Sequence, residues 1–99
     1  MSYKKLVIKS TAPIEIENVV VLNTEISKTL GQRLEKKLRN SFLKIAENPE
    51  GFQFRHKMIR IIWLKKFPYG IYYLFDSDEV YIIAFWSTRA DIDSKITHL

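Results

Sequence analysis

The stretch between Phe67 and Asp91 constrains the fold of this chain most strongly, because apolar residues occupy both parities on either side of a short acidic turn. Successive side chains of a β-strand point to opposite faces of the sheet. A hairpin with one face in water would alternate apolar and polar residues. Both faces of this hairpin are therefore expected to leave water, and each face needs its own cover.

The N-terminal third predicts one strand and one helix. Residues 3–8 read as a short strand, and Ser10 or Thr11 is expected to cap the helix that follows, with Pro13 in its first turn. The apolar residues of this helix include the β-branched run Val19–Val21, which fits a helix poorly by propensity.

A second helix is predicted up to Asn48, where Asn48-Pro49 ends it. Apolar residues recur at three- and four-residue steps and form one stripe: Leu30, Leu34, Leu38, Phe42 and Ile45. The remaining surface of the helix is mostly basic. Such a surface is compatible with a nucleic-acid contact, although a solvated basic face is the commoner explanation.

Three runs of strand length follow, over residues 56–66, 69–75 and 80–86. Short connections between such runs favour antiparallel neighbours. The predicted order is strand, helix, helix, strand, strand, strand. It indicates an α+β fold in which a two-helix hairpin packs on one face of an antiparallel sheet.

Two helices cover only one face of a sheet, so part of the hairpin needs another cover. Strand alternation places Tyr69 and Tyr73 on one face and Tyr72 on the other. Either the tail after Trp86 folds back over the second face, or a partner protein lies across it. The pattern leaves both explanations open, and the three tyrosines are the candidate partner contacts.

Length and composition indicate one small domain spanning residues 1–99. The net charge of +5, from 16 basic and 11 acidic residues, is compatible with an acidic partner. The chain has no cysteine, and its N-terminal apolar run Leu6–Ile8 is too short for a membrane span or a signal-peptide core. These features predict a cytoplasmic protein without a membrane partner.

No cofactor or metal site is predicted. Asp76, Asp78 and Glu79 share a hairpin turn, where acidic residues form local hydrogen bonds with the backbone. His56 and His98 stand apart from any nucleophile or metal-ligand pattern.

Several motifs between Leu38 and Asp91 resemble the RelE/ParE superfamily of type II toxins. They are "IAENPEGF" at the end of the second helix, Arg60 in the next strand, "FPYGIYY", an acidic hairpin, "IIAFW" and Arg89. The first third of the chain matches by element order only. The resemblance implies the fold already predicted, together with an antitoxin protein whose acidic, apolar segment wraps the toxin. Such an antitoxin would supply the missing cover.

The RelE branch of this superfamily implies ribosome-dependent cleavage of mRNA. That reaction needs cations around a pentavalent phosphate and groups that transfer protons. Where the resemblance places these groups, this chain has Gly70, Ile61, Trp63 and, in place of a tyrosine, Lys95. Arg89 alone matches and would be the catalytic residue of a ribonuclease. A catalytic function is therefore not expected.

Four residues are the candidate contacts to a cellular target: Arg89, Trp86, Arg60 and Lys95. A structural hydrogen bond at the sheet edge is the alternative role of Arg60. Pairing with Asp91 or Asp93 is the alternative role of Arg89.

The resemblance implies a ParE-like toxin of a two-gene module, linked to growth inhibition and plasmid stabilisation. It would bind DNA gyrase and be neutralised in a hetero-oligomer with its antitoxin. Two alternatives stay open: a RelE-type ribosome-dependent mRNA endoribonuclease, and a non-toxic degenerate relative that acts as an interaction module. Residues 86–92 bear on all three interpretations: they read "WSTRADI" where many relatives have "W-H-x-R-R-D-P", so the chain lacks a histidine, an arginine and a proline of that pattern.

Overall fold

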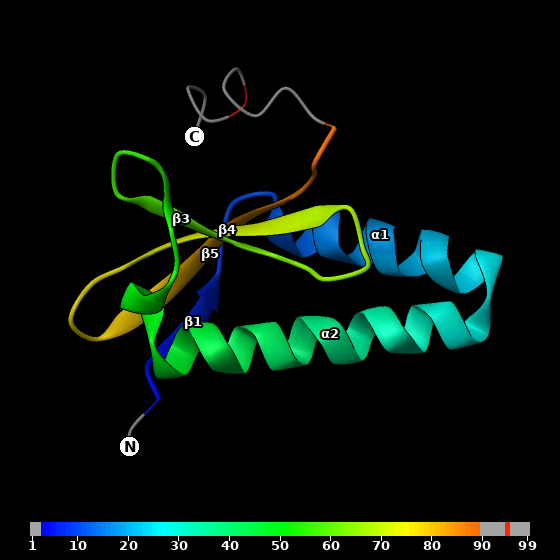
Figure 1. Cartoon of the computed structure of the whole chain (residues 1–99), viewed down its shortest axis with the longest axis horizontal. Coiled ribbons are helices and arrows are strands. Elements are labelled where there is room, and N and C mark those ends of the chain that lie inside the picture. The colour runs from blue at the N-terminus through cyan, green and yellow to red at the C-terminus, as the bar shows by residue number, and fades with distance from the viewer. Residues whose placement is uncertain (1–2, 90–94, 96–99) are drawn as a thin grey trace.

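The structure is a computed structural model that describes residues 3–89 and residue 95. Figure 1 shows the arrangement of its elements. Their order is β1 (Lys5–Ile8), α1 (Ala12–Ile26), α2 (Lys28–Glu47), the 3-10 turn η1 (Pro49–Gly51), β2 (Phe54–His56), β3 (Ile59–Trp63), β4 (Tyr69–Phe75) and β5 (Glu79–Ser87).

The strands form one five-stranded sheet in the order β1-β5-β4-β3-β2. The predicted α+β fold is confirmed, with two differences in the sheet. β1 lies parallel to β5, with Lys5 opposite Glu79, so the sheet is mixed rather than wholly antiparallel. The predicted strand 56–66 is divided by a turn at Lys57, whose φ is 51°, and the additional strand β2 pairs with β3.

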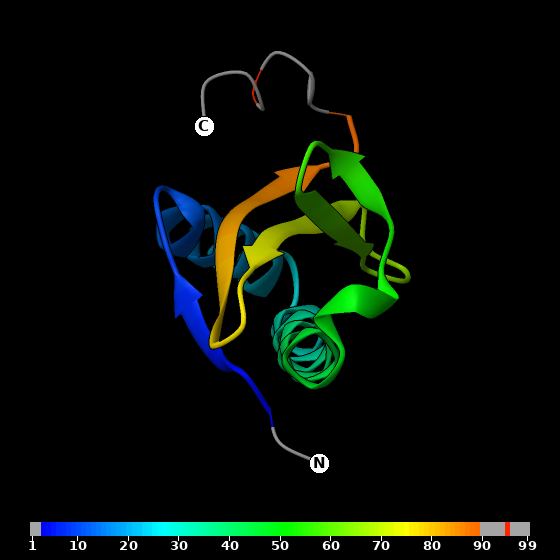
Figure 2. The same ribbon diagram turned by 90° about the vertical axis from the view of Figure 1, so that its left-hand side faces the viewer.

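The two helices form a hairpin on one face of the sheet (Figure 2). Ser27 separates them, and its side chain accepts a hydrogen bond from the Leu30 amide at the start of α2. Thr11 occupies the N-cap position of α1, as predicted, but its side chain makes no capping bond. Gly31 lets the helices approach closely, because a Cβ atom there would lie 2.9 Å from the Thr24 Cα atom.

Two separate apolar clusters cover the two faces of the sheet. The first packs Ile71, Tyr73 and Phe85 against Leu34 and Leu38 of α2. The second cluster consists of Ile61, Tyr72, Ile83, Ala84 and Trp86. Both faces of the hairpin are thus buried, as the sequence predicts.

A register shift between Tyr72 and Tyr73 controls how β5 contributes to these clusters. Tyr72 lies opposite Ala84, whereas Tyr73 lies opposite Ile82, so β5 carries one extra residue at Ile83. Such a β-bulge changes the parity of the strand. As a result Ile82 and Phe85 face the helices, while the two residues between them face the other way.

Candidate functional site

Glu15 of α1 holds the end of β5 on the second face of the sheet. Pairing of β1 with β5 ends at Ile82, so the following edge of β5 has no strand beside it on that side. The two Glu15 oxygens take its place: one accepts from the Phe85 amide at 3.1 Å and the other from Trp86 Nε1 at 2.7 Å. Trp86 is thereby fixed and only 6% exposed. It is a poor candidate for a large direct contact with a target.

Gly70 lies beneath the Trp63 ring and the Ile61 side chain on this face. A Cβ atom there would lie 2.7 Å from Ile61 Cδ1 and 2.9 Å from the Trp63 ring. Tyr72 sits beside them, with its ring centroid 6.4 Å from that of Trp63 and 4.9 Å from that of Trp86. The RelE resemblance would place an arginine at position 70 and lysines at positions 61 and 63. In this chain Ile61 and Trp63 instead pack directly on the glycine backbone at position 70.

Arg89 and Lys95 lie close to the end of β5. The Lys95 Nζ atom is 5.4 Å from the centroid of the Trp86 ring, a cation–π distance. The turn after β5 is fixed by bonds from the Thr88 amide to the Pro68 carbonyl and from the Arg89 amide to Ser87 Oγ. Arg89 is exposed, and none of the described residues forms a hydrogen bond or ion pair with its guanidinium. Asp91, Asp93 and His98 lie outside the described residues.

Arg60 is separated from these residues and has a structural role. Its Nη1 atom donates to the carbonyls of Glu50 at 3.1 Å and Phe52 at 2.7 Å. Its guanidinium also lies 3.8 Å from the centroid of the Phe54 ring. The structure thus favours the alternative role of Arg60, a hydrogen-bonded brace for the η1 turn, over direct contact with a target.

Tyr73 completes this brace from β4. Its hydroxyl donates to the Pro49 carbonyl at 2.7 Å in a buried position. Burial raises the pKa of Tyr73 to about 12, although the nearby Arg60 charge acts in the opposite direction. Pro49, Arg60 and Tyr73 belong to three motifs that carry the family resemblance, and here they hold one turn against the sheet.

The three tyrosines proposed as partner contacts differ in exposure. Tyr72 and Tyr73 are each 0% exposed, so neither offers an open surface in the free chain, and their contact with an antitoxin stays a prediction. Tyr72 lies between the rings of Trp63 and Trp86. Tyr73 is covered by the helices and the η1 turn. Tyr69 is half-buried, and its ring stacks on Phe85 with the centroids 5.2 Å apart.

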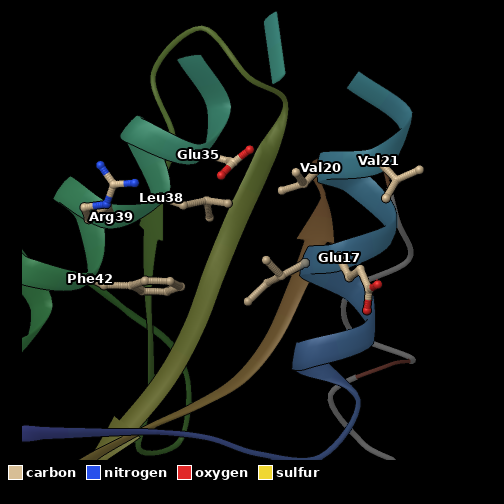
Figure 3. A pocket seen from close by; sticks show the side chains of 8 residues that line it. Glu17, Val20, Val21, Glu35, Leu38, Arg39 and Phe42 are labelled. Carbon is tan, nitrogen blue, oxygen red and sulfur yellow. The ribbon is translucent and has the colours of Figure 1, made fainter. Parts of the chain in front are cut away.

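The helix hairpin carries an apolar surface that the sequence analysis missed. A groove of about 430 Å³ runs between α1 and α2 (Figure 3). Its lining residues are Ile16, Glu17, Val20, Val21, Glu35, Leu38, Arg39 and Phe42. Val21 is 47% exposed, and Ile14, Leu22 and Ile26 extend the apolar surface of α1. The β-branched run of α1 was the available signal, because a helix that is apolar on several sides needs more than one cover.

The acidic turn after β4 has a local structural role. Asp76 accepts hydrogen bonds from the amides of Asp78 and Glu79, each at 2.8 Å, and from the Tyr81 hydroxyl at 2.9 Å. These bonds lower the pKa of Asp76. Across residues 3–89 and 95, no three His, Cys, Asp or Glu side chains are grouped so that they could hold a metal ion. No helix in this part of the chain has the length and apolarity to cross a membrane.

Comparison with known proteins supports the fold. No protein-family model matches the sequence, and no curated protein matches it. Among solved structures, the chain is similar to one from the chromosomal ParDE TA system from P. aeruginosa, with a TM-score of 0.71 and 9% sequence identity. The similarity covers 86% of this chain and 96% of that chain. At this level of identity the likeness establishes the fold.

Proposed function

We propose that this chain is the toxin of a two-gene toxin–antitoxin module, that it acts in the cytoplasm by binding its target, and that a cognate antitoxin neutralises it. The observation that carries the proposal is the fold shared with a chain of a ParDE TA system across almost the whole of both chains. The sequence motifs between Leu38 and Asp91 point to the same superfamily independently.

The packing around Gly70 supports a binder rather than a nuclease. A ribonuclease of the RelE type needs several cations around one phosphate. At the corresponding positions the Trp63 ring and the Ile61 side chain lie directly over Gly70. Arg89 remains as one exposed cation at the end of β5. We therefore propose DNA gyrase, the target that the ParE resemblance implies, with Arg89 and Lys95 as contact residues.

The groove between α1 and α2 is the better candidate for the antitoxin, because Tyr72 and Tyr73 are buried. The exposed Val21 and the half-buried Val20 and Phe42 would be covered by apolar side chains of the antitoxin. Glu17, Glu35 and Arg39 at its sides offer charged partners that fix the register of the bound segment. Tyr69 is the one of the three predicted tyrosines that is still accessible to the same partner.

Induced expression in bacterial cells tests the toxin assignment. Growth should stop, DNA breaks should accumulate, and co-expression of the small acidic protein encoded beside this gene should restore growth. Arg89→Ala should relieve the arrest, whereas Arg33→Ala, which removes an exposed arginine from α2, should not. Ribosome-dependent mRNA cuts that Arg89→Ala abolishes would instead establish the endoribonuclease. Normal growth at high expression would identify a non-toxic relative.

The antitoxin site has its own test. Val21→Lys places a charge in the groove and should weaken the complex with the antitoxin at least tenfold. Leu43→Lys is the matched control, because Leu43 is 51% exposed on α2 and lies outside the groove lining. Equal affinities of the two variants, measured by calorimetry, would exclude the groove.

A further inference from the structure

A second groove, of about 500 Å³, lies between α2 and the edge of the sheet at β3. Its lining includes Lys37, Ser41, Lys44, Trp63 and Lys65. We call this the lysine groove. It lies on the opposite flank of α2 from Glu35 and Arg39, which line the groove between α1 and α2, called the helix groove from here on.

The charge of the lysine groove is uniformly positive. Lys37 and Lys44 come from α2 and Lys65 from the loop after β3, and no acidic residue is among the described residues of the lining. Lys37 and Lys44 are two helical turns apart, which corresponds to about 10.5 Å along the helix axis. At this spacing the two ammonium groups can contact successive charges, so the arrangement fits a ligand with several negative charges along its length.

The floor of the lysine groove offers an unused polar group. Ser41 is only 5% exposed, yet its side chain lines the groove between the two lysines of α2. No described residue forms a hydrogen bond with its hydroxyl. Because the hydroxyl opens onto the groove rather than being enclosed in the core, it can donate a hydrogen bond to a ligand oxygen.

Trp63 adds an aromatic surface to one wall of the groove. It is 40% exposed, whereas Trp86 is 6% exposed. Exposed aromatic rings beside a positive groove are the usual means of binding single-stranded nucleic acid, because a base stacks on the ring. A carboxylate ligand would favour arginine, which forms paired hydrogen bonds with it, whereas lysine serves phosphate as a point charge. The cations here are all lysine.

We propose that the lysine groove binds the phosphodiester backbone of single-stranded nucleic acid, with one base stacked on Trp63. This site is separate from the helix groove and from Arg89, and it does not depend on the proposed function.

Trp63 provides a direct probe of binding. Oligothymidylate and oligouridylate of about 15 nucleotides should quench the tryptophan fluorescence of the full chain, and stacking on a buried Trp86 cannot produce this effect. Lys37→Gln with Lys44→Gln should weaken binding at least tenfold. It should also reduce the slope of log affinity against log salt by about 1.4, since each lost phosphate contact accounts for about 0.7.

A pair of substitutions on the same helix serves as the matched control. Lys28→Gln with Lys36→Gln lowers the formal net charge from +5 to +3, as the groove pair does, but neither residue lines the groove. The control should change the affinity less than threefold. Trp63→Phe should retain binding and Trp63→Leu should weaken it about fivefold or more, with thermal melts to verify folding.

Three outcomes would overturn the proposal. Absence of quenching would exclude stacking on Trp63. Equal losses in the two lysine pairs would show that net charge alone attracts the oligonucleotide. Equal binding of polyglutamate would indicate an acidic protein as the ligand.

Discussion

Gly70 has no room for a side chain on the second face of the sheet. We expect Gly70→Ala to lower the free energy of unfolding by about 1–3 kcal/mol, because the added methyl group meets the Trp63 ring at 2.9 Å and a buried isoleucine. Urea denaturation measures this change.

Gly51→Ala is the control for the loss of a glycine. The added Cβ atom would meet the side-chain amide of Asn48, which is exposed and free to turn away. Its cost should be well below that of Gly70→Ala. If the two substitutions lower the free energy of unfolding equally, the close contact of Gly70 with Ile61 and Trp63 is not the cause of the loss.

Tyr73 gives the fold a pH limit on the alkaline side. Its folded-state pKa of about 12 lies above the ordinary value of 10.0, so the folded protein holds the phenol proton more tightly than the unfolded chain does. This contribution is complete below about pH 10 and is lost as the pH rises through 12. Tyr73→Phe should therefore make the decline in stability between pH 10 and 12 less steep, as measured by urea denaturation at each pH.

The same substitution has a cost at neutral pH. It removes the bond to the Pro49 carbonyl and should lower the free energy of unfolding by about 1–2 kcal/mol. Tyr69→Phe is the control, because the Tyr69 hydroxyl has no hydrogen bond to any described residue. An unchanged stability of Tyr73→Phe would contradict the structural role of the brace.

At the scale of elements, Glu15 joins α1 to β5 through one carboxylate. Glu15→Ala should cost about 2–4 kcal/mol, because the Phe85 amide and the Trp86 indole both lose their acceptor in a partly buried site. Glu15→Gln keeps one acceptor oxygen and should cost less. Glu17→Ala, an exposed change two residues away, should stay within about 0.5 kcal/mol of the parent. The ranking is read from thermal or urea denaturation.

The sequence predicted the elements well where the pattern is local. The stripe of α2, its end at Asn48 and the strands β4 and β5 lie where expected. β2 was missed because a three-residue strand carries too little alternation to be distinguished from a loop. The parallel pairing of β1 with β5 joins segments from opposite ends of the chain, and no local pattern encodes it.

The candidate site was predicted less well, because burial depends on distant partners. Strand alternation correctly separated Tyr72 from Tyr73, yet it could not show that both faces are closed. The hydrogen bond from the Trp86 indole to Glu15 joins residues 71 positions apart, so no local pattern predicts it. Arg89, by contrast, lies exposed at the end of β5, where the sequence placed it. Its contact with a target remains a prediction.

For the whole molecule, the sheet order predicts a gradient of stability. β4 and β5 are central, and each has a strand on both sides, whereas β2 is a three-residue edge strand with an irregular register. We expect the slowest amide hydrogen exchange in β4 and β5, limited by global unfolding, and much faster exchange in β2. Exchange followed by NMR measures this order. Uniform protection across the sheet would indicate that β2 is as tightly held as the centre.

The parallel pairing of β1 with β5 also sets an order in time. Lys5 is made before both helices, but its partner Glu79 follows about 4–15 s later at a synthesis rate of about 5–20 residues per second. During that interval the helix hairpin exists without the strands that cover its inner face. Under the proposed function, an antitoxin synthesised from a neighbouring gene would meet the nascent chain while this apolar helix face is still exposed.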